Sequence, residues 1–201
     1  MDIVYGQPLK ELLQISSYFK EQLIVLVNTE TQELQVKKSF LKPCFLINEK
    51  SDLSKLKNKR KAVVGGSIVS NELAVKTKAD FLLQPCNAKQ FFDLGLAKKL
   101  AENNTRVVLM FDEMRGKNSF ERHQYWKNYL EVVNYCKRKG TKFIVASGGK
   151  EPLALRPKKV RQALVEILGI EKDKAEEYLR EEVKWKCFVW NKSVFCVILY
   201  G

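Results

Sequence analysis

The chain has 201 residues, of which 45% are apolar, and its 36 lysines and arginines outnumber 23 aspartates and glutamates, giving a net charge of +13. This length suits one domain spanning residues 1–201, and the apolar content excludes an intrinsically disordered chain. No apolar run reaches the ~20 residues that cross a bilayer and no signal pattern opens the chain, so we expect a cytoplasmic protein without a membrane partner. The excess positive charge predicts RNA or another polyanion as partner, although a lysine-rich soluble surface has the same composition.

Short apolar runs alternate with helix-like repeats along the chain. The strand-like runs are Met1–Tyr5, Leu23–Val27, Cys44–Asn48, Ala62–Val64, Phe81–Pro85, Arg106–Phe111 and Phe143–Ala146. Helices are predicted around Leu9–Phe19, from Asn71, over Ala88–Asn103, from Asn118 to Gly140, from Pro157 to Gly169 and over the acidic segment Asp173–Val183. Two last apolar runs, Cys187–Trp190 and Val194–Leu199, read as strands. This alternation predicts an α/β fold with a mostly parallel sheet, either a compact (β/α) barrel or a doubly wound sheet.

Apolar spacing predicts the buried faces of the later helices. In the helix over Ala88–Asn103 the expected inward residues are Phe91, Phe92, Leu96 and Leu100. In the helix after Asn118 they are Phe120, Trp126, Tyr129, Leu130, Val133 and Cys136. In the helix after Pro157 they are Val160, Ala163, Leu164, Ile167 and Leu168.

Cysteine and histidine usage limits the chemistry of the chain. The five cysteines, which are Cys44, Cys86, Cys136, Cys187 and Cys196, form no CxxC pair, so reduced core thiols are expected rather than disulfides or a zinc site. His123 is the single histidine, and it is expected to face solvent on a helix. Because metal centres in barrels usually need several imidazoles, we expect no metal site.

Two glycine turns follow strands and could bind a small phosphorylated substrate: Gly65-Gly66-Ser67 and Ser147-Gly148-Gly149. Asp112 and Glu113 also end a strand, where they could act as acid and base or bind magnesium. Their neighbours Arg115 and Lys117 favour a salt bridge instead. A metabolic barrel enzyme is therefore the alternative function.

Lysines and arginines gather in loops and at helix starts. The candidate RNA-binding residues are Lys76, Lys78, Lys89, Arg115, Lys117, Lys150, Arg156, Lys158 and Lys159. A small phosphate ester needs two or three such groups, whereas an RNA backbone uses many. We therefore expect a basic rim at one end of the barrel that contacts RNA. A nonspecific nucleic-acid-binding protein is a further alternative.

Several short motifs occur in the order and spacing of a known family. They are Asp80-Phe81-Leu82-Leu83-Gln84-Pro85, Leu96-Ala97-Lys98 with Asn104, Asn118-Ser119-Phe120-Glu121-Arg122, Phe143-Ile144-Val145-Ala146-Ser147, Arg156-Pro157 and Leu168-Gly169. Through them the chain resembles ribonuclease P protein component 3 of archaea and eukaryotes. This family has a TIM-like barrel related to the polymerase-and-histidinol-phosphatase (PHP) superfamily, and the similarity is clearest from Asp80 to about Leu179.

The resemblance implies a PHP-like barrel without the metal site and without catalytic residues of its own. Such a subunit supports the RNA-catalysed removal of the 5′ leader from precursor tRNA. The implied partners are ribonuclease P RNA, precursor tRNA, a small protein partner subunit and the other protein subunits. The chain is expected to bind no cofactor, and Mg²⁺ is expected to serve the RNA catalyst. Local motif alignment implies RNA contacts by Lys89, Arg115 and Arg156.

Overall fold

The computed structural model describes residues 2–5, 23–27, 42–48, 56, 59–148 and 156–179. Its strands are β1 (Asp2–Tyr5), β2 (Leu23–Val27), β3 (Lys42–Ile47), β4 (Lys61–Val64), β5 (Phe81–Leu83), β6 (Arg106–Met110) and β7 (Phe143–Ala146). The helices are α3 (Ile68–Lys76), α4 (Leu94–Glu102), α5 (Ser119–Lys139) and α6 (Lys158–Ile167), with single 3₁₀ turns at Asp112–Met114 and Glu177–Leu179.

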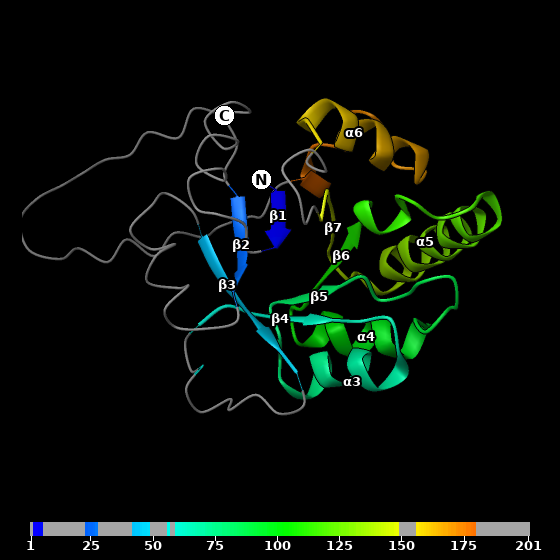
Figure 1. Ribbon diagram of the computed structural model, residues 1–201. Coiled ribbons are helices and arrows are strands. Elements are labelled where there is room, and N and C mark those ends of the chain that lie inside the picture. The colour runs from blue at the N-terminus through cyan, green and yellow to red at the C-terminus, as the bar shows by residue number, and fades with distance from the viewer. Residues whose placement is uncertain are drawn as a thin grey trace, which may run out of the picture.

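The seven strands form one parallel sheet whose spatial order is the chain order, β1 to β7. The sheet curls, and α3 to α6 lie on its outer side (Figure 1). A doubly wound sheet reverses its strand order part-way, which this sheet does not, so the TIM-like arrangement is the one observed. Within the described residues β7 does not pair with β1, so the curled sheet is a barrel that is not closed.

Two layers of apolar side chains lie on opposite faces of the sheet because neighbouring strand residues point in opposite directions. The inner layer includes Phe81, Val108 and Ile144 from successive strands. The outer layer, which includes Leu82 and Val107, packs against the helices. Both layers explain why the strands appear in the sequence as continuous apolar runs.

All four helices end in the same way before the chain turns back to the sheet. The residues just after α3, α4, α5 and α6 that adopt a positive φ are Lys78, Asn104, Gly140 and Gly169. The following N–H groups donate to carbonyls five residues earlier, as in Ala79 to Ala74 at 3.0 Å and Thr105 to Leu100 at 2.9 Å. This is the Schellman motif, in which glycine is the usual left-handed residue. The first two helices use lysine and asparagine there.

Two predicted helices differ from the structure. The helix predicted over Ala88–Asn103 begins only at Leu94, because the Asp93 side chain accepts from the Leu96 N–H and caps it. Phe91 and the buried Phe92 therefore lie in the preceding loop. The acidic helix predicted over Asp173–Val183 is wrong over 173–179, where the chain forms turns and one 3₁₀ turn. The rest of that segment and the runs 187–190 and 194–199 lie outside the described residues, as do Leu9–Phe19.

Two predicted helix faces are also wrong in part. On α5 Phe120 is 70% exposed and Leu130 46% exposed, since Asn128 takes a buried position and donates to the Asn87 carbonyl. On α6 Val160 and Ile167 are exposed, whereas the buried residues are Arg161 and Val165. A pattern that counts only apolar residues misses a helix face built around a hydrogen-bonded polar side chain.

The described cysteines Cys44, Cys86 and Cys136 are buried and not disulfide-bonded, as predicted, and His123 is exposed, as predicted. Cys187 and Cys196 lie outside the described residues. None of the helices in the described ranges is long and apolar enough to cross a membrane.

Alkaline pH is expected to destabilise the protein through two of these thiols. Burial raises the pKa of Cys136 to about 12, and burial together with the Glu131 charge raises that of Cys86 to about 12, both from 9.0. The unfolded chain ionises these thiols first, so their contribution is complete below pH 9 and is lost as the pH rises toward 12. Each thiol should lower the free energy of unfolding by about 1.4 kcal/mol per pH unit in that window.

Urea unfolding at several pH values across this window measures the slope. The Cys136→Ala variant, although less stable at neutral pH, should lose less stability per pH unit than the parent. If the free energy of unfolding fell equally with pH in the two proteins, the Cys136 thiol would not be a source of the pH dependence.

Candidate nucleic-acid interface

A parallel sheet has two chemically distinct ends, one where all strands begin and one where they finish. Lys89 follows β5, Arg115 and Lys117 follow β6, and Arg156 follows β7. The first two residues of α6 are Lys158 and Lys159, which belong to the same end. Six of the predicted RNA-binding residues therefore share the carboxyl end of the sheet.

Backbone and side-chain hydrogen bonds tie the loops after β6 and β7 together. The Asp112 N–H donates to the Ser147 carbonyl at 2.9 Å, and the Arg156 N–H donates to Ser147 Oγ at 2.8 Å. Asp112 Oδ1 lies 3.1 Å from Arg115 Nε, which is the salt bridge that the sequence favoured. Of the groups that an enzyme would need at this point, the Ser147 hydroxyl accepts from the Arg156 N–H, and the Asp112 carboxylate is paired with Arg115 within its own loop.

Arg161 is a residue that sequence reasoning missed. It is fully buried on α6, and its Nε donates to the Arg156 carbonyl at 3.2 Å. A basic residue one turn into an amphipathic helix gives no sequence signal of burial, because arginines normally lie at the surface. Arg161 positions the backbone of Arg156 and so belongs to the framework of the carboxyl end.

The first glycine turn is accounted for by packing alone. A Cβ atom on Gly65 would lie 2.4 Å from Asn71 Oδ1, so only glycine fits there. Asn71 is buried and donates to the carbonyls of Pro85 at 2.7 Å and Phe91 at 2.8 Å. Ser67 caps α3 together with Ser70. The turn has these structural roles without any phosphate ligand, and Gly149 of the second turn lies outside the described residues.

Two predicted residues do not belong to the carboxyl-end group. Lys76 is the last residue of α3 and Lys78 follows it, which places both at the end where β5 begins. The expectation of a single basic rim is wrong for these two, because a helix that returns along a parallel sheet carries its last turn to the opposite end. Lys150 lies outside the described residues. Lys158, although at the carboxyl end, is ion-paired with Glu176.

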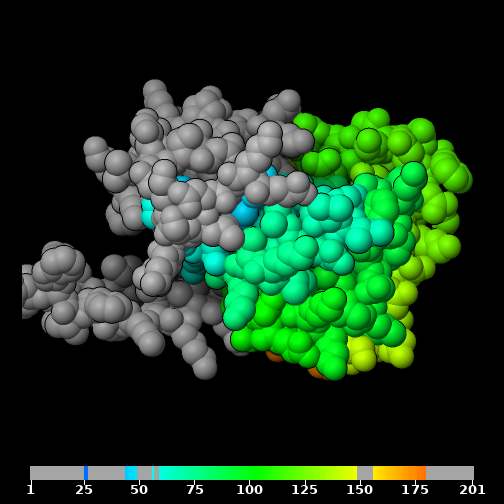
Figure 2. Space-filling view, turned by 90° about the horizontal axis from the view of Figure 1, so that it is seen from below, coloured from blue at the N-terminus to red at the C-terminus, as the bar shows by residue number. Residues whose placement is uncertain are grey.

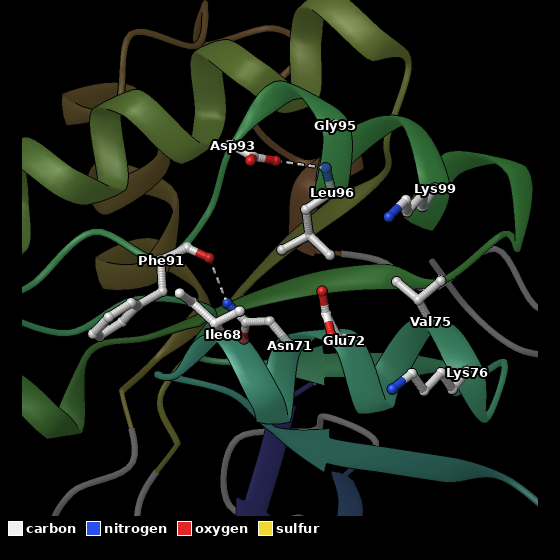
Figure 3. Close-up of a pocket in the computed structure, with 10 residues that line it drawn as sticks. All are labelled: Ile68, Asn71, Glu72, Val75, Lys76, Phe91, Asp93, Gly95, Leu96 and Lys99. Atoms are coloured by element: carbon white, nitrogen blue, oxygen red, sulfur yellow. Dashed lines mark hydrogen bonds between the residues drawn. The ribbon is translucent and has the colours of Figure 1, made fainter.

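A groove of about 400 Å³ lies between α3 and α4 on the outer side of the sheet. Val75 and Leu96 give it apolar walls, while Glu72, Lys76 and Lys99 place charges of both signs around it (Figure 3). Figure 2 shows the outer face on which these parts of the chain, coloured cyan to green, lie side by side. Of the predicted RNA-binding residues only Lys76 lines this groove.

Within the ranges that the structure describes, no three His, Cys, Asp or Glu side chains gather closely enough to hold a metal ion. The fold and the loops at the two ends of the sheet define a class of protein. It is an α/β scaffold with a curled parallel sheet, strands in TIM-like order, and charged loops at both ends of the sheet.

Comparison with known proteins agrees with this class. No protein-family model and no curated protein matches the chain. Among solved structures, it is similar to a chain of the cryo-EM structure of archaeal ribonuclease P with mature tRNA, with a TM-score of 0.71, 15% identity, and coverage of 88% of this chain and 85% of that chain. A crystal structure of an uncharacterised protein aligns with a TM-score of 0.46, 12% identity, and coverage of 84% and 44%. The first comparison shows a shared fold over most of the chain.

Proposed function

We propose that this chain is an RNA-binding protein subunit of ribonuclease P, of the component 3 type. The observation that carries the proposal is the fold shared, over 88% of the chain, with a chain of the archaeal ribonuclease P structure. The net charge of +13 supports it, because a protein that binds folded RNA must neutralise many phosphates. The local motifs from Asp80 to Leu179 support the choice of component 3.

In this proposal the RNA carries out the chemistry and the protein stabilises its folded state. The subunit acts in the cytoplasm with ribonuclease P RNA, precursor tRNA, a small partner subunit and other protein subunits. Magnesium serves the RNA in removing the 5′ leader. The protein contributes lysines and arginines that contact phosphates, and at the carboxyl end these are Lys89, Arg115, Lys117, Arg156, Lys158 and Lys159, with Lys150 from the same stretch of sequence.

Arg156→Ala is the sharpest test of the carboxyl-end contacts. The backbone N–H and carbonyl of residue 156 bond to Ser147 and Arg161, so alanine retains both hydrogen bonds. We expect binding of ribonuclease P RNA to weaken several-fold and the slope of log affinity against log salt to fall by about 1. The variant should remain folded. Filter binding over a salt series and urea unfolding measure the two quantities.

Lys172→Ala is the matched control, because Lys172 is an exposed cation between Glu171 and Asp173. It should bind RNA like the parent. Omitting the protein from a reconstitution of tRNA 5′ processing should abolish activity at low magnesium. Full activity without the protein, or turnover by the protein without RNA, would refute the proposed function.

A further inference from the structure

We propose that the end of the sheet where the strands begin is a second RNA-binding surface, and that it takes the phosphate backbone of a folded RNA. We define the amino-end surface as segments 59–61, 76–80, 98–106 and 137–142. The inference rests on the proposed function, since it assigns a further contact to the same RNA-binding protein.

Charge is distributed unequally between the two ends of the sheet. The amino-end surface contains twelve lysines and arginines and two acidic residues, Asp80 and Glu102. The carboxyl-end segments 65–67, 84–93, 111–122, 147–148 and 156–161 contain eight lysines and arginines and four acidic residues, and one of the eight is the buried Arg161. Among the described residues, the larger excess of positive charge therefore lies at the end that the motifs did not indicate.

Backbone hydrogen bonds fix three cations and one aspartate of this surface in a row across neighbouring strands. The Asp80 N–H donates to the Lys61 carbonyl at 2.9 Å, and the Arg106 N–H donates to the Asp80 carbonyl at 2.9 Å. The Val107 N–H donates to the Lys142 carbonyl at 3.0 Å. Lys61, Asp80, Arg106 and Lys142 thus follow one another along the starts of β4 to β7, at intervals of about 4.8 Å. Such a row can follow a phosphate backbone.

The loops that carry the cations are linked to one another. Thr105 Oγ1 donates to the Ala79 carbonyl at 2.7 Å, and Asn103 Nδ2 donates to the Val75 carbonyl at 2.9 Å. Thr141 Oγ1 donates to the Ala97 carbonyl at 2.8 Å. These bonds join three successive helix-to-strand connections, so the surface is organised before any ligand binds, which lowers the entropic cost of binding.

Helix dipoles explain only part of the charge. Cations in the last turn of a helix are stabilising, which accounts for Lys76, Lys99 and the 137–139 run. Half of the twelve lie outside helices, namely Lys59, Arg60, Lys61, Lys78, Arg106 and Lys142. Within the described residues no ion pair involves Lys78, Lys99, Arg138 or Lys139. These side chains keep their charge available for a partner.

The backbone at Lys78 gives an independent reason for the assignment. Lys78 has φ +46° at the position where α5 and α6 have Gly140 and Gly169. A side chain in this left-handed conformation costs about 1 kcal/mol relative to glycine. Strain of this kind marks positions where the residue itself is needed, and at Lys78 the retained group is an exposed cation.

Exposed apolar residues favour RNA over protein as the occupant of the amino end. Of the seven large exposed apolar residues in the described part of the chain, none lies in the amino-end surface. Phe120 and Val160 lie in the carboxyl-end segments, and Val64, Ile68 and Val69 flank the segment 65–67. Protein interfaces are enriched in apolar groups and depleted of lysine, whereas phosphate contacts use lysine and arginine.

Two double variants separate the ends, each removing two charges. Lys78→Gly with Lys139→Gln tests the amino end, and Lys89→Gln with Lys159→Gln tests the carboxyl end. The probes are ribonuclease P RNA and, for backbone contacts alone, a perfectly paired RNA duplex. We expect the amino-end variant to lose about 20-fold in affinity near 0.15 M salt and to lower the salt slope by about 2.

Asn104→Gly is the matched control because Asn104 is the neutral left-handed residue after α4. Both glycine substitutions should stabilise the fold, and only the one that removes Lys78 should weaken RNA binding. Loss of affinity in a protein that has become more stable excludes misfolding as its cause. Lysine acetylation with and without RNA, read by mass spectrometry, should show protection of Lys78, Lys99 and Lys139.

If the amino-end variant keeps the parental affinity for RNA and the parental salt slope, the inference is overturned. If the carboxyl-end variant then binds RNA more weakly than the parent, the proposed function still stands. The inference would also be overturned if the amino-end variant bound RNA like the parent but no longer bound an acidic protein partner. If the parent binds neither RNA probe, the proposed function itself is wrong.

Discussion

Tyr129→Ala is expected to lower the free energy of unfolding by about 3–5 kcal/mol, the typical cost of removing a buried aromatic side chain. Tyr129 is completely buried on α5, and its ring meets those of Phe111 and Tyr125 edge-on at 5.8 and 6.2 Å. Its hydroxyl donates to the Met110 carbonyl at the last residue of β6 at 2.9 Å. The substitution therefore removes packing between helix and sheet together with a buried hydrogen bond. Urea unfolding measures the loss.

Tyr129→Phe separates these two contributions. It retains the ring and leaves the Met110 carbonyl without the hydroxyl donor, which should cost about 1–3 kcal/mol. Burial raises the pKa of Tyr129 well above its usual value, so the hydroxyl remains a donor throughout the neutral range. If the alanine variant were no less stable than the phenylalanine variant, the ring would not be part of the core.

Gly148→Ala is expected to destabilise the protein by about 2–4 kcal/mol. Gly148 follows β7 with φ +69°, and a Cβ atom there would lie 2.7 Å from the Cβ and Cε atoms of Met110. The substitution therefore combines left-handed backbone strain with a collision that the rigid Cβ of Met110 cannot avoid. Thermal and urea unfolding of the purified variant measure the effect.

Gly140→Ala is the control for the backbone term. Gly140 has φ +70°, but a Cβ atom there would meet nothing within 4 Å. Alanine at position 140 should lower the free energy of unfolding by about 1 kcal/mol, because of the left-handed backbone conformation alone. The excess loss in Gly148→Ala then measures the collision with Met110. Equal losses in the two variants would show that the end of β7 has room for a side chain.

Strands β5 to β7 were predictable because they are buried on both faces and appear as continuous apolar runs. Phe143–Ala146 is predicted and observed with the same bounds, and every side chain in it is buried. Alternation of strands and helices predicted a mostly parallel sheet but left its strand order open between a barrel and a doubly wound sheet. Helix starts were less predictable where a loop carries apolar residues, as at Phe92, which is buried without belonging to a helix.

The candidate site was predictable only in part. Lys89 and Arg156 lie at the carboxyl end, as expected for loops that follow strands, because the carboxyl ends of parallel strands share one edge; their contact with RNA stays a prediction. Lys78 was grouped with them by charge, but it precedes a strand and lies at the other end. The burial of Arg161 was not predictable, because arginines normally lie at the surface and the sequence does not show its bond to the Arg156 carbonyl.

The common ending of the four helices has a consequence for how such a protein can change. Thr77–Asp80 and Asn103–Arg106 follow the same backbone path, closed by equivalent N–H groups at Ala79 and Thr105. Exchanging residues at positions 78 and 104 should therefore leave the strands in register. In the proposed RNA-binding role, single codon changes at these connections can alter which nucleic acids the protein prefers, while the sheet remains unchanged.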